Sequence, residues 1–237
     1  MNPAKQKIRE SIWKKLTQAK VGAFPFPLVG RIPNFKGASE AAEQLSGLEI
    51  WQSSRTIKSN PDAPQRPVRE KGLREGKQVF MAVPRLRDEK PFRQLNPEKI
   101  RDIKKAVAIK GAMNLGIPTS VEELPFIDLV IAGSVAVNKD GRRLGKGGGY
   151  SDLEFALASH HGKITAKTLI VTTVHPLQIT EEDIPMERHD IPVDFIITPD
   201  TVIETNTRYP RPSGIFPEIL SDDYIENIPA IAKLLGS

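Results

Sequence analysis

Four glycines and three cations lie within one short stretch of the chain, Arg142-Arg143-Leu144-Gly145-Lys146-Gly147-Gly148-Gly149-Tyr150-Ser151-Asp152. Glycine has no Cβ, so its backbone can approach a phosphate closely and adopt positive φ. Cationic side chains and unpaired backbone amides attract a phosphate's negative charge. The stretch therefore predicts a phosphate-binding loop served by Arg142, Arg143 and Lys146. A flexible surface hairpin is the alternative, because Asn138-Lys139-Asp140-Gly141 just upstream is typical of a turn.

The residues on either side of this loop predict a strand before it and a helix after it. Residues 127–132 form an apolar run typical of a buried strand, and residues 153–158 begin a helical pattern. Ser151 and Glu154 have the spacing of a capping box, which would place the glycines just before a helix N-terminus. The helix dipole favours an anion there. The glycine order fits neither the Walker A loop nor the dinucleotide fingerprint, whose third glycine would fall at Tyr150.

Acidic residues near the loop are candidate metal ligands. Asp152, in the first helical turn, would repel a phosphate unless Mg²⁺ bridged the two, and Mg²⁺ commonly joins one or two carboxylates to phosphate oxygens. Glu187-Arg188-His189-Asp190 holds further candidate ligands, among them Asp190, although an ordinary polar loop is the alternative. His175 follows a predicted strand and either points into the site or serves the structure.

Composition excludes several kinds of chemistry. The chain has 237 residues and no cysteine, which excludes disulfides, thiolate catalysis and cysteine-ligated metals. No apolar run approaches the length of a membrane span, and Met1–Lys20 is too charged for a signal-peptide core, so we expect a soluble cytoplasmic protein. Residues 1–120 carry 24 Lys and Arg against 11 Asp and Glu. Such a basic half suits nucleotides, phosphates, polyglutamate tails or nucleic acid, or simply solvated helix faces.

The remaining pattern alternates apolar strands with amphipathic helices. This is typical of a mostly parallel sheet covered on both faces, in an α/β protein. We expect one domain over residues 1–237, with a Pro-rich arm at 22–34 and a tail from about residue 206. The predicted strands are 51–58, 77–83, 127–132, 168–174 and 194–198; the predicted helices are 4–20, 39–45, 67–75, 97–111, 153–160 and 222–235.

Three motifs resemble those of the 5-formyltetrahydrofolate cyclo-ligases, also called methenyltetrahydrofolate synthetases. Residues 141–152 are similar to the family's G-x-R-L-G-[RK]-G-G-G-Y-Y-D signature. Residues 189–198 are similar to its H-D-x-x-V-D-x-I-I-T segment, and Lys5-Gln6-Lys7-Ile8-Arg9 resembles the basic opening of its first helix. The resemblance spans roughly residues 4–205 and implies a Rossmann-like three-layer α/β/α fold.

The resemblance also implies a reaction. MgATP would be the cosubstrate, and 5-formyltetrahydrofolate would be closed to 5,10-methenyltetrahydrofolate with release of ADP and phosphate. By position, Lys146, Arg143 and Tyr150 would be catalytic, and Asp152 and Asp190 would bind Mg²⁺. The nucleotide would be held by Lys5, Arg9, Arg142, Gly145, Gly147, Gly148, Gly149 and Ser151.

The sequence departs from the family pattern in ways that leave alternatives open. Ser151 replaces a tyrosine, and the acidic E-x-x-T region that helps hold folate has no evident counterpart near residues 60–69. These features look closer to a divergent paralog group, whose members would bind a nucleotide or a phosphorylated metabolite, such as a thiamin-related one, without cyclising folate. A nucleic-acid-binding module is weaker, because no RNA-recognition signature is present. We expect small-molecule partners, no membrane, and a monomer or homodimer.

Overall fold

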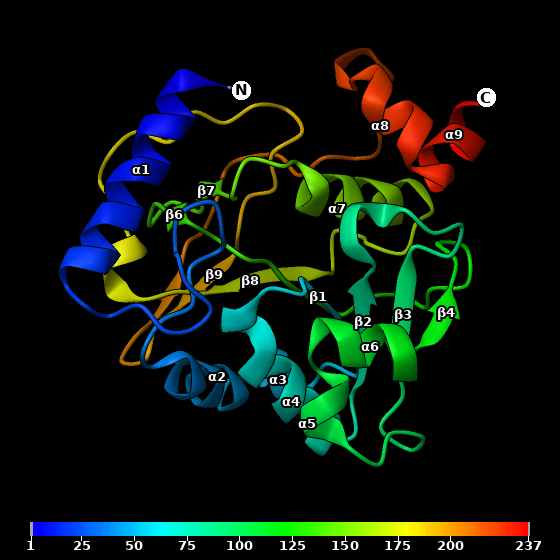
Figure 1. Ribbon diagram of the computed structural model, residues 1–237, viewed down its shortest axis with the longest axis horizontal. Helices are drawn as coiled ribbons and strands as arrows, with labels where there is room; N and C mark the ends of the chain where they lie inside the picture. Colours follow the sequence, from blue (N-terminus) through cyan, green and yellow to red (C-terminus); the bar gives the residue numbers. More distant parts are fainter. Residues whose placement is uncertain (1, 237) are drawn as a thin grey trace.

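The computed structural model describes residues 2–236, and within them eight strands form one twisted sheet (Figure 1). The strand order is β10-β9-β8-β5-β1-β2-β3-β4. The five central strands run parallel, whereas β3, β4 and β10 pair antiparallel at the two edges. Their bounds are β1 (Thr56–Ser59), β2 (Gln78–Ala82), β3 (Phe92–Leu95), β4 (Ile117–Thr119), β5 (Leu129–Ile131), β8 (Leu169–Thr173), β9 (Phe195–Ile197) and β10 (Val202–Glu204).

Helices cover both faces of this sheet, because consecutive side chains of the central strands point to opposite sides. Val130 of β5 packs in one buried cluster with Phe155 of α7. Its neighbours Leu129 and Ile131 pack in another with Leu45 of α2. The helices are α1 (Pro3–Gln18), α2 (Ala38–Ser46), α3 (Glu49–Gln52), α4 (Arg66–Arg74), α5 (Ile103–Ala106), α6 (Ile109–Leu115), α7 (Tyr150–His160), α8 (Asp222–Asn227) and α9 (Pro229–Leu235). The predicted three-layer, mostly parallel α/β architecture is confirmed.

Helix α1 lies apart from the main sheet and against a small hairpin. Its apolar face, which includes Ile12 and Leu16, packs on Ala136 of β6 (Ala136–Val137) and Leu144 of β7 (Arg143–Leu144). Figure 1 shows α1 beside the β6–β7 hairpin, away from the helices that cover the sheet. The hairpin continues directly into the glycine loop, so this packing brings the first turns of α1 next to that loop.

Two predicted elements differ from the structure. Residues 49–52 form helix α3, so the strand predicted at 51–58 begins only at Thr56. The helix predicted at 97–111 is two short helices, because Ala108 is extended between them. The helices pack so closely that a Cβ on Gly111 would lie 1.7 Å from the Lys105 carbonyl oxygen. A continuous helix cannot make this approach.

Further differences concern the edges and the C-terminal segment. The antiparallel strands β3, β4 and β10 were not predicted. The helix predicted at 222–235 is interrupted at Ile228, which is extended because Pro229 disfavours helical geometry in the residue before it. Within residues 2–236, no helix has the length and apolar character required to cross a membrane.

Candidate nucleotide site

A cavity of about 680 Å³ lies at the carboxyl edge of the parallel strands. Residues that follow β1, β2 and β5 line it, together with the start of α1 and the whole glycine loop. In open α/β sheets, ligands bind at this edge. Its size falls in the range of small-molecule pockets. Of the predicted site residues, the cavity brings together Lys5, Arg9, Arg143, Gly145, Lys146, Gly147, Gly148, Gly149, Tyr150, Ser151, Asp152 and Asp190.

The glycine loop presents a row of unused amide donors to this cavity. Within residues 2–236, no backbone N–H from Gly145 to Ser151 donates a hydrogen bond to another protein group. Gly147 and Gly149 have φ of 101° and 66°, values that side-chain-bearing residues rarely adopt. Helix α7 begins directly afterwards, so its positive end faces the same space. The arrangement is suited to a phosphate group.

The predicted capping box at the start of α7 is wrong. Gly149 occupies the N-cap position, and no side chain caps the helix. The Ser151 hydroxyl instead donates to Asn60 Oδ1 across 3.0 Å, and Glu154 bonds Lys58 and Asn60. These tertiary partners replace the local backbone partners that the sequence spacing suggested. The helix start is thereby left open to a ligand.

Lys5 and Arg9 lie one helical turn apart on α1 and both face the cavity. Lys5 Nζ forms an ion pair with Asp190 Oδ2 at 2.5 Å. Arg9 Nε donates to the Gly145 carbonyl at 2.7 Å, which fastens α1 to the glycine loop. Burial lowers the pKa of Arg9, while Asp190 and Asp152 oppose that effect. Both cations are largely buried and held in place before any ligand arrives.

The two adjacent arginines of the hairpin have different roles. Arg143 is buried beneath the loop and donates to the Gly133 carbonyl at 2.9 Å and to Asp152 Oδ1 at 2.5 Å. Arg142 does not line the cavity; it pairs with Asp140 and Asp183 on the other side of the hairpin. The structure therefore does not bring Arg142 to the predicted nucleotide contacts, because neighbouring residues of a strand point to opposite sides.

Lys146 is the most accessible cation of the glycine loop. Its side chain is 45% exposed, and its Nζ lies 2.9 Å from Asp62 Oδ1. Asp62 follows β1 and is held in place through its backbone by Arg69, a buried guanidinium that donates to the carbonyls of Asn60, Pro61 and Asp62. Burial lowers the pKa of Arg69 to about 9. The Asp62 carboxylate thus lines the same cavity as the unpaired amides of the glycine loop.

A buried ion pair adjoins the cavity, which is lined by one of its two members, Glu154. Lys58 of β1 and Glu154 of α7 pair through Glu154 Oε2, which also accepts a 2.8 Å hydrogen bond from Asn60. Burial raises the pKa of Glu154, and Lys58 opposes the rise. Asn60 Oδ1 accepts from both Gly133 and Ser151, so one amide side chain joins three elements of the site. This network sets the position of the first turn of α7.

The two predicted metal ligands, Asp152 and Asp190, both line the cavity, and the second oxygen of Asp190 lies 3.9 Å from His189 Nε2. Asp152 Oδ1 accepts from Arg143 and from the amide of Ile191, the residue after Asp190. Asp190 Oδ2 accepts from Lys5 and from the Glu187 amide. Within residues 2–236, neither second carboxylate oxygen accepts a hydrogen bond or is sealed from solvent. Two carboxylate oxygens beside a candidate phosphate site are ligands of the kind that Mg²⁺ takes.

Glu187 and His189 lie close to Asp190 and are further candidate metal ligands. Their ligand atoms and that of Asp190 lie within 4.8 Å of one another. Lys5 Nζ lies 3.7 Å from Glu187 Oε2, so Lys5 already offsets part of the negative charge of this group. His175, in contrast, does not line the cavity; its Nδ1 accepts from the Leu177 amide. Burial lowers the pKa of His175, as expected for a structural, neutral histidine.

The Pro-rich arm forms one wall of the cavity. Gly30 and Ile32 of the arm line it, and Pro84, Arg85 and Ile109 line it as well. Two aromatic side chains of the arm point to solvent, Phe24 with 79% and Phe26 with 58% of its surface exposed.

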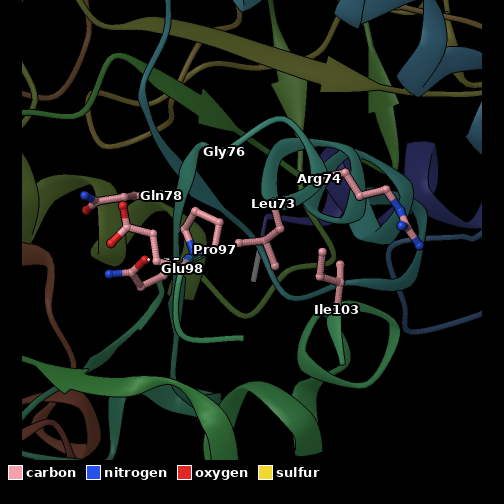
Figure 2. Close-up of a pocket in the computed structure, with 8 residues that line it drawn as sticks. Leu73, Arg74, Gly76, Gln78, Pro97, Glu98 and Ile103 are labelled. Carbon is pink, nitrogen blue, oxygen red and sulfur yellow. Dashed lines mark hydrogen bonds between the residues drawn. The ribbon is translucent and has the colours of Figure 1, made fainter. Parts of the chain in front are cut away.

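A second hollow, of about 600 Å³, lies near the amino end of β2 (Figure 2). It is lined by Leu73, Arg74, Gly76, Gln78, Asn96, Pro97, Glu98 and Ile103. Figure 2 shows the side chains of Arg74 and Gln78 extending in opposite directions. Arg74 pairs with Glu70, and Gln78 bonds Gln94. The polar groups here do not converge on a common point. This hollow also lies at the amino edge of the parallel strands, whereas the first cavity lies at their carboxyl edge, so the first cavity is the candidate site.

Comparison with known proteins identifies the group to which this fold and site belong. Residues 1–199 match the 5-formyltetrahydrofolate cyclo-ligase family. The chain belongs to this family.

Relatives of two kinds share this membership. The "Methenyltetrahydrofolate synthase domain-containing protein" of Mus musculus is 40% identical over 237 residues, covering 98% of this chain and 63% of that protein. The chain thus spans about three fifths of the length of that relative. The 5-formyltetrahydrofolate cyclo-ligase of Escherichia coli (strain K12) is 36% identical over 81 residues, 34% of this chain and 41% of that protein. The solved structure of Aquifex aeolicus 5,10-methenyltetrahydrofolate synthetase shares the fold, with a TM-score of 0.55, 20% identity and coverage of 85% and 93% of the two chains.

The sequence alone does not predict several residues of this candidate site. No sequence motif assigns Asn60 or Asp62 to this cavity, and the capping-box spacing assigns Glu154 to the helix start instead. A usable signal was the position of Asn60 and Asp62 directly after a parallel strand, where ligands collect. For the Lys58–Glu154 pair no local signal exists, because the partners are far apart along the chain.

Proposed function

We propose that this protein is an ATP- and Mg²⁺-dependent enzyme that cyclises 5-formyltetrahydrofolate to 5,10-methenyltetrahydrofolate and releases ADP and phosphate. The observation that carries the proposal is the run of unpaired amides from Gly145 to Ser151, next to Lys5 and Arg9. It supports a polyphosphate at the glycine loop. Family membership supports the folate substrate.

The proposed reaction needs positioning rather than a covalent nucleophile. The formyl oxygen attacks the terminal phosphorus of ATP, and the bond from that phosphorus to the ADP oxygen breaks. N10 then attacks the activated formyl carbon and loses its proton, and hydrogen phosphate leaves with the former formyl oxygen and that proton. Cations that neutralise the transferring phosphoryl group stabilise such a step. The glycine-loop amides, Lys5, Arg9 and Lys146 supply this stabilisation in the proposal.

Asp152 and Asp190 would hold Mg²⁺ through the carboxylate oxygens that accept no hydrogen bond within residues 2–236. The metal, when bound, neutralises phosphate charge and orients the polyphosphate. Arg143 acts beneath the loop by fixing the direction of the Asp152 carboxylate. Tyr150, at the first position of α7, lines the cavity beside the loop.

The direct test is an absorbance assay for the methenyl product with protein, MgATP and 5-formyltetrahydrofolate. We expect product only when all three are present, and a strongly reduced rate with Lys146→Ala. Lys139→Ala is the matched control, because that lysine is exposed on the hairpin and does not line the cavity. A protein that binds MgATP but forms no product contradicts the proposal.

A second candidate function is nucleotide or phosphorylated-metabolite binding without folate cyclisation. It is favoured by the part of the cavity that would hold the folate. There Asp62 follows β1 in place of the family's E-x-x-T pattern, and its carboxylate is paired with Lys146. Thermal-shift screening distinguishes the candidates, since a ligand at 100 times its Kd stabilises the folded state by about 2.7 kcal/mol. Stabilisation by MgATP and by 5-formyltetrahydrofolate supports the cyclo-ligase. Stabilisation by MgATP alone supports the second candidate.

A further inference from the structure

The C-terminal segment, which lies beyond the part of the chain that matches the family, packs directly on the glycine loop. The family match ends at residue 199, whereas α8 and α9 begin at Asp222 and Pro229. Ile228 and Ile231 are buried in the same cluster as Phe155 of α7. Figure 1 shows α8 and α9 alongside α7. The segment is thus anchored in the core next to the loop.

Tyr224 of α8 makes the contact. Its hydroxyl donates a 2.6 Å hydrogen bond to the carbonyl oxygen of Gly148. Its ring packs edge-to-face against Tyr150, with 5.4 Å between ring centroids. A Cβ built on Gly149 would lie 3.4 Å from the same hydroxyl. Tyr224 therefore contacts the loop at three successive residues.

This hydrogen bond has a consequence for the neighbouring amide. The carbonyl of Gly148 and the N–H of Gly149 belong to one planar, trans peptide unit, in which they point in opposite directions. Glycine on both sides of that unit allows it to rotate freely between orientations. By holding the carbonyl on the α8 side, Tyr224 directs the Gly149 N–H away from α8. That amide is among the unpaired donors of the loop.

The C-terminal segment also contacts a second loop at the cavity, the loop that carries Asp190. Arg188 lies between the cavity-lining residues Glu187 and His189. Its guanidinium forms an ion pair with Glu218 and stacks on Phe216, 4.3 Å from the ring centroid. Residues 216–224 thus connect the glycine loop with the loop that carries Asp190.

We propose that Tyr224 is a positioning residue of the anion site, which orients the Gly148–Gly149 peptide so that its N–H meets a bound phosphate. The inference rests on the proposed function only in placing a polyphosphate at the glycine loop. It extends the functional site to a segment outside the family match. It requires no contact between Tyr224 and the ligand.

The test compares Tyr224→Phe with the wild-type chain by titration calorimetry, using MgATP and inorganic triphosphate as probes. Phenylalanine keeps the ring packing on Tyr150 and removes only the hydroxyl. We expect roughly three- to tenfold weaker binding of both probes, the range for loss of one hydrogen bond. Tyr209→Phe is the matched control, because Tyr209 contacts Arg142 outside the cavity, and we expect unchanged binding.

Two further readouts separate positioning from a structural role. In the cyclisation assay, the KM for ATP should rise by the same factor while the KM for the folate substrate stays constant. The amide signal of Gly149 should shift in the ¹⁵N–¹H spectrum of the ligand-free variant, whether or not its melting temperature changes. Equal probe affinity in Tyr224→Phe and wild type, or an unmoved Gly149 signal, overturns the inference. If the wild type binds neither probe, the proposed function fails, and the Gly149 signal still tests the orientation of the peptide.

Discussion

Arg143 and Asp152 form an ion pair at 2.5 Å directly beneath the glycine loop, with only 1% of the arginine side chain and 15% of the aspartate side chain exposed. The sequence places both residues near the loop, and the structure shows that they bind each other. The guanidinium holds one carboxylate oxygen, and the other remains available at the cavity. Arg143 therefore fixes the direction of the Asp152 carboxylate at the cavity.

The first prediction concerns stability. Arg143→Gln leaves the partly buried Asp152 without its cation and also removes the bonds to the Gly133 and Ile191 carbonyls. We expect a loss of about 3 kcal/mol in the free energy of unfolding, typical for breaking a buried pair. Urea unfolding measures the loss. Arg142→Gln is the control and should cost less than about 1 kcal/mol, because its partners Asp140 and Asp183 are exposed. Equal losses would show that burial of Arg143 has been misjudged.

The second prediction concerns nucleotide affinity. Lys146 is half exposed and pairs with Asp62, so Lys146→Ala should leave the unfolding free energy nearly unchanged. Binding of MgATP should weaken by about tenfold, the magnitude of a lost charge-assisted hydrogen bond. Titration calorimetry on the variant and on Lys139→Ala provides the comparison. Wild-type affinity in Lys146→Ala would place the phosphates elsewhere.

The third prediction concerns magnesium. Asparagine at position 152 keeps an oxygen that can accept from Arg143 and the Ile191 amide, but it removes the negative charge that attracts the metal. Asp152→Asn should therefore require a higher Mg²⁺ concentration for half-maximal activity at saturating ATP, by about tenfold or more. Asp140→Asn, on the hairpin outside the cavity, should titrate as the wild type does. An unchanged Mg²⁺ requirement in Asp152→Asn would remove this carboxylate from the metal site.

The fourth prediction concerns the buried Lys58–Glu154 pair and the pH dependence of stability that follows from it. Lys58→Met leaves Glu154 buried without its countercharge, and burial already raises the pKa of Glu154 above its ordinary value of 4.5. The folded variant then binds a proton more tightly than the unfolded chain, so its stability falls as pH rises from 4.5 through the raised pKa.

Unfolding measurements at acidic and alkaline pH test this sign. We expect Lys58→Met to lose about 3 kcal/mol relative to wild type at neutral pH and clearly less near the acidic end. The double variant Lys58→Met/Glu154→Leu is the control. Its loss of unfolding free energy relative to wild type should not increase as the pH rises. A loss in Lys58→Met that grows toward acid would contradict the assignment.

The amino-acid sequence by itself determined the sheet class and the position of the glycine loop that we propose as the anion site. Near-continuous apolar runs at 127–132 and 168–174 are typical of strands that are buried on both faces. The clustered glycines require a backbone that makes close approaches, whatever surrounds it. Lys5 and Arg9 share a helix face through their spacing alone. These properties are local, so they can be read along the chain.

Tertiary structure alone decided the partner of each side chain. It buried Arg143 and turned Arg142 away, although the two are adjacent and chemically identical. It drew Ser151 and Glu154 from the expected helix cap to Asn60 and Lys58. It also brought Tyr224 to Gly148 from a segment with no motif. Contacts between residues far apart in sequence depend on how the layers pack, and local spacing carries no record of that packing.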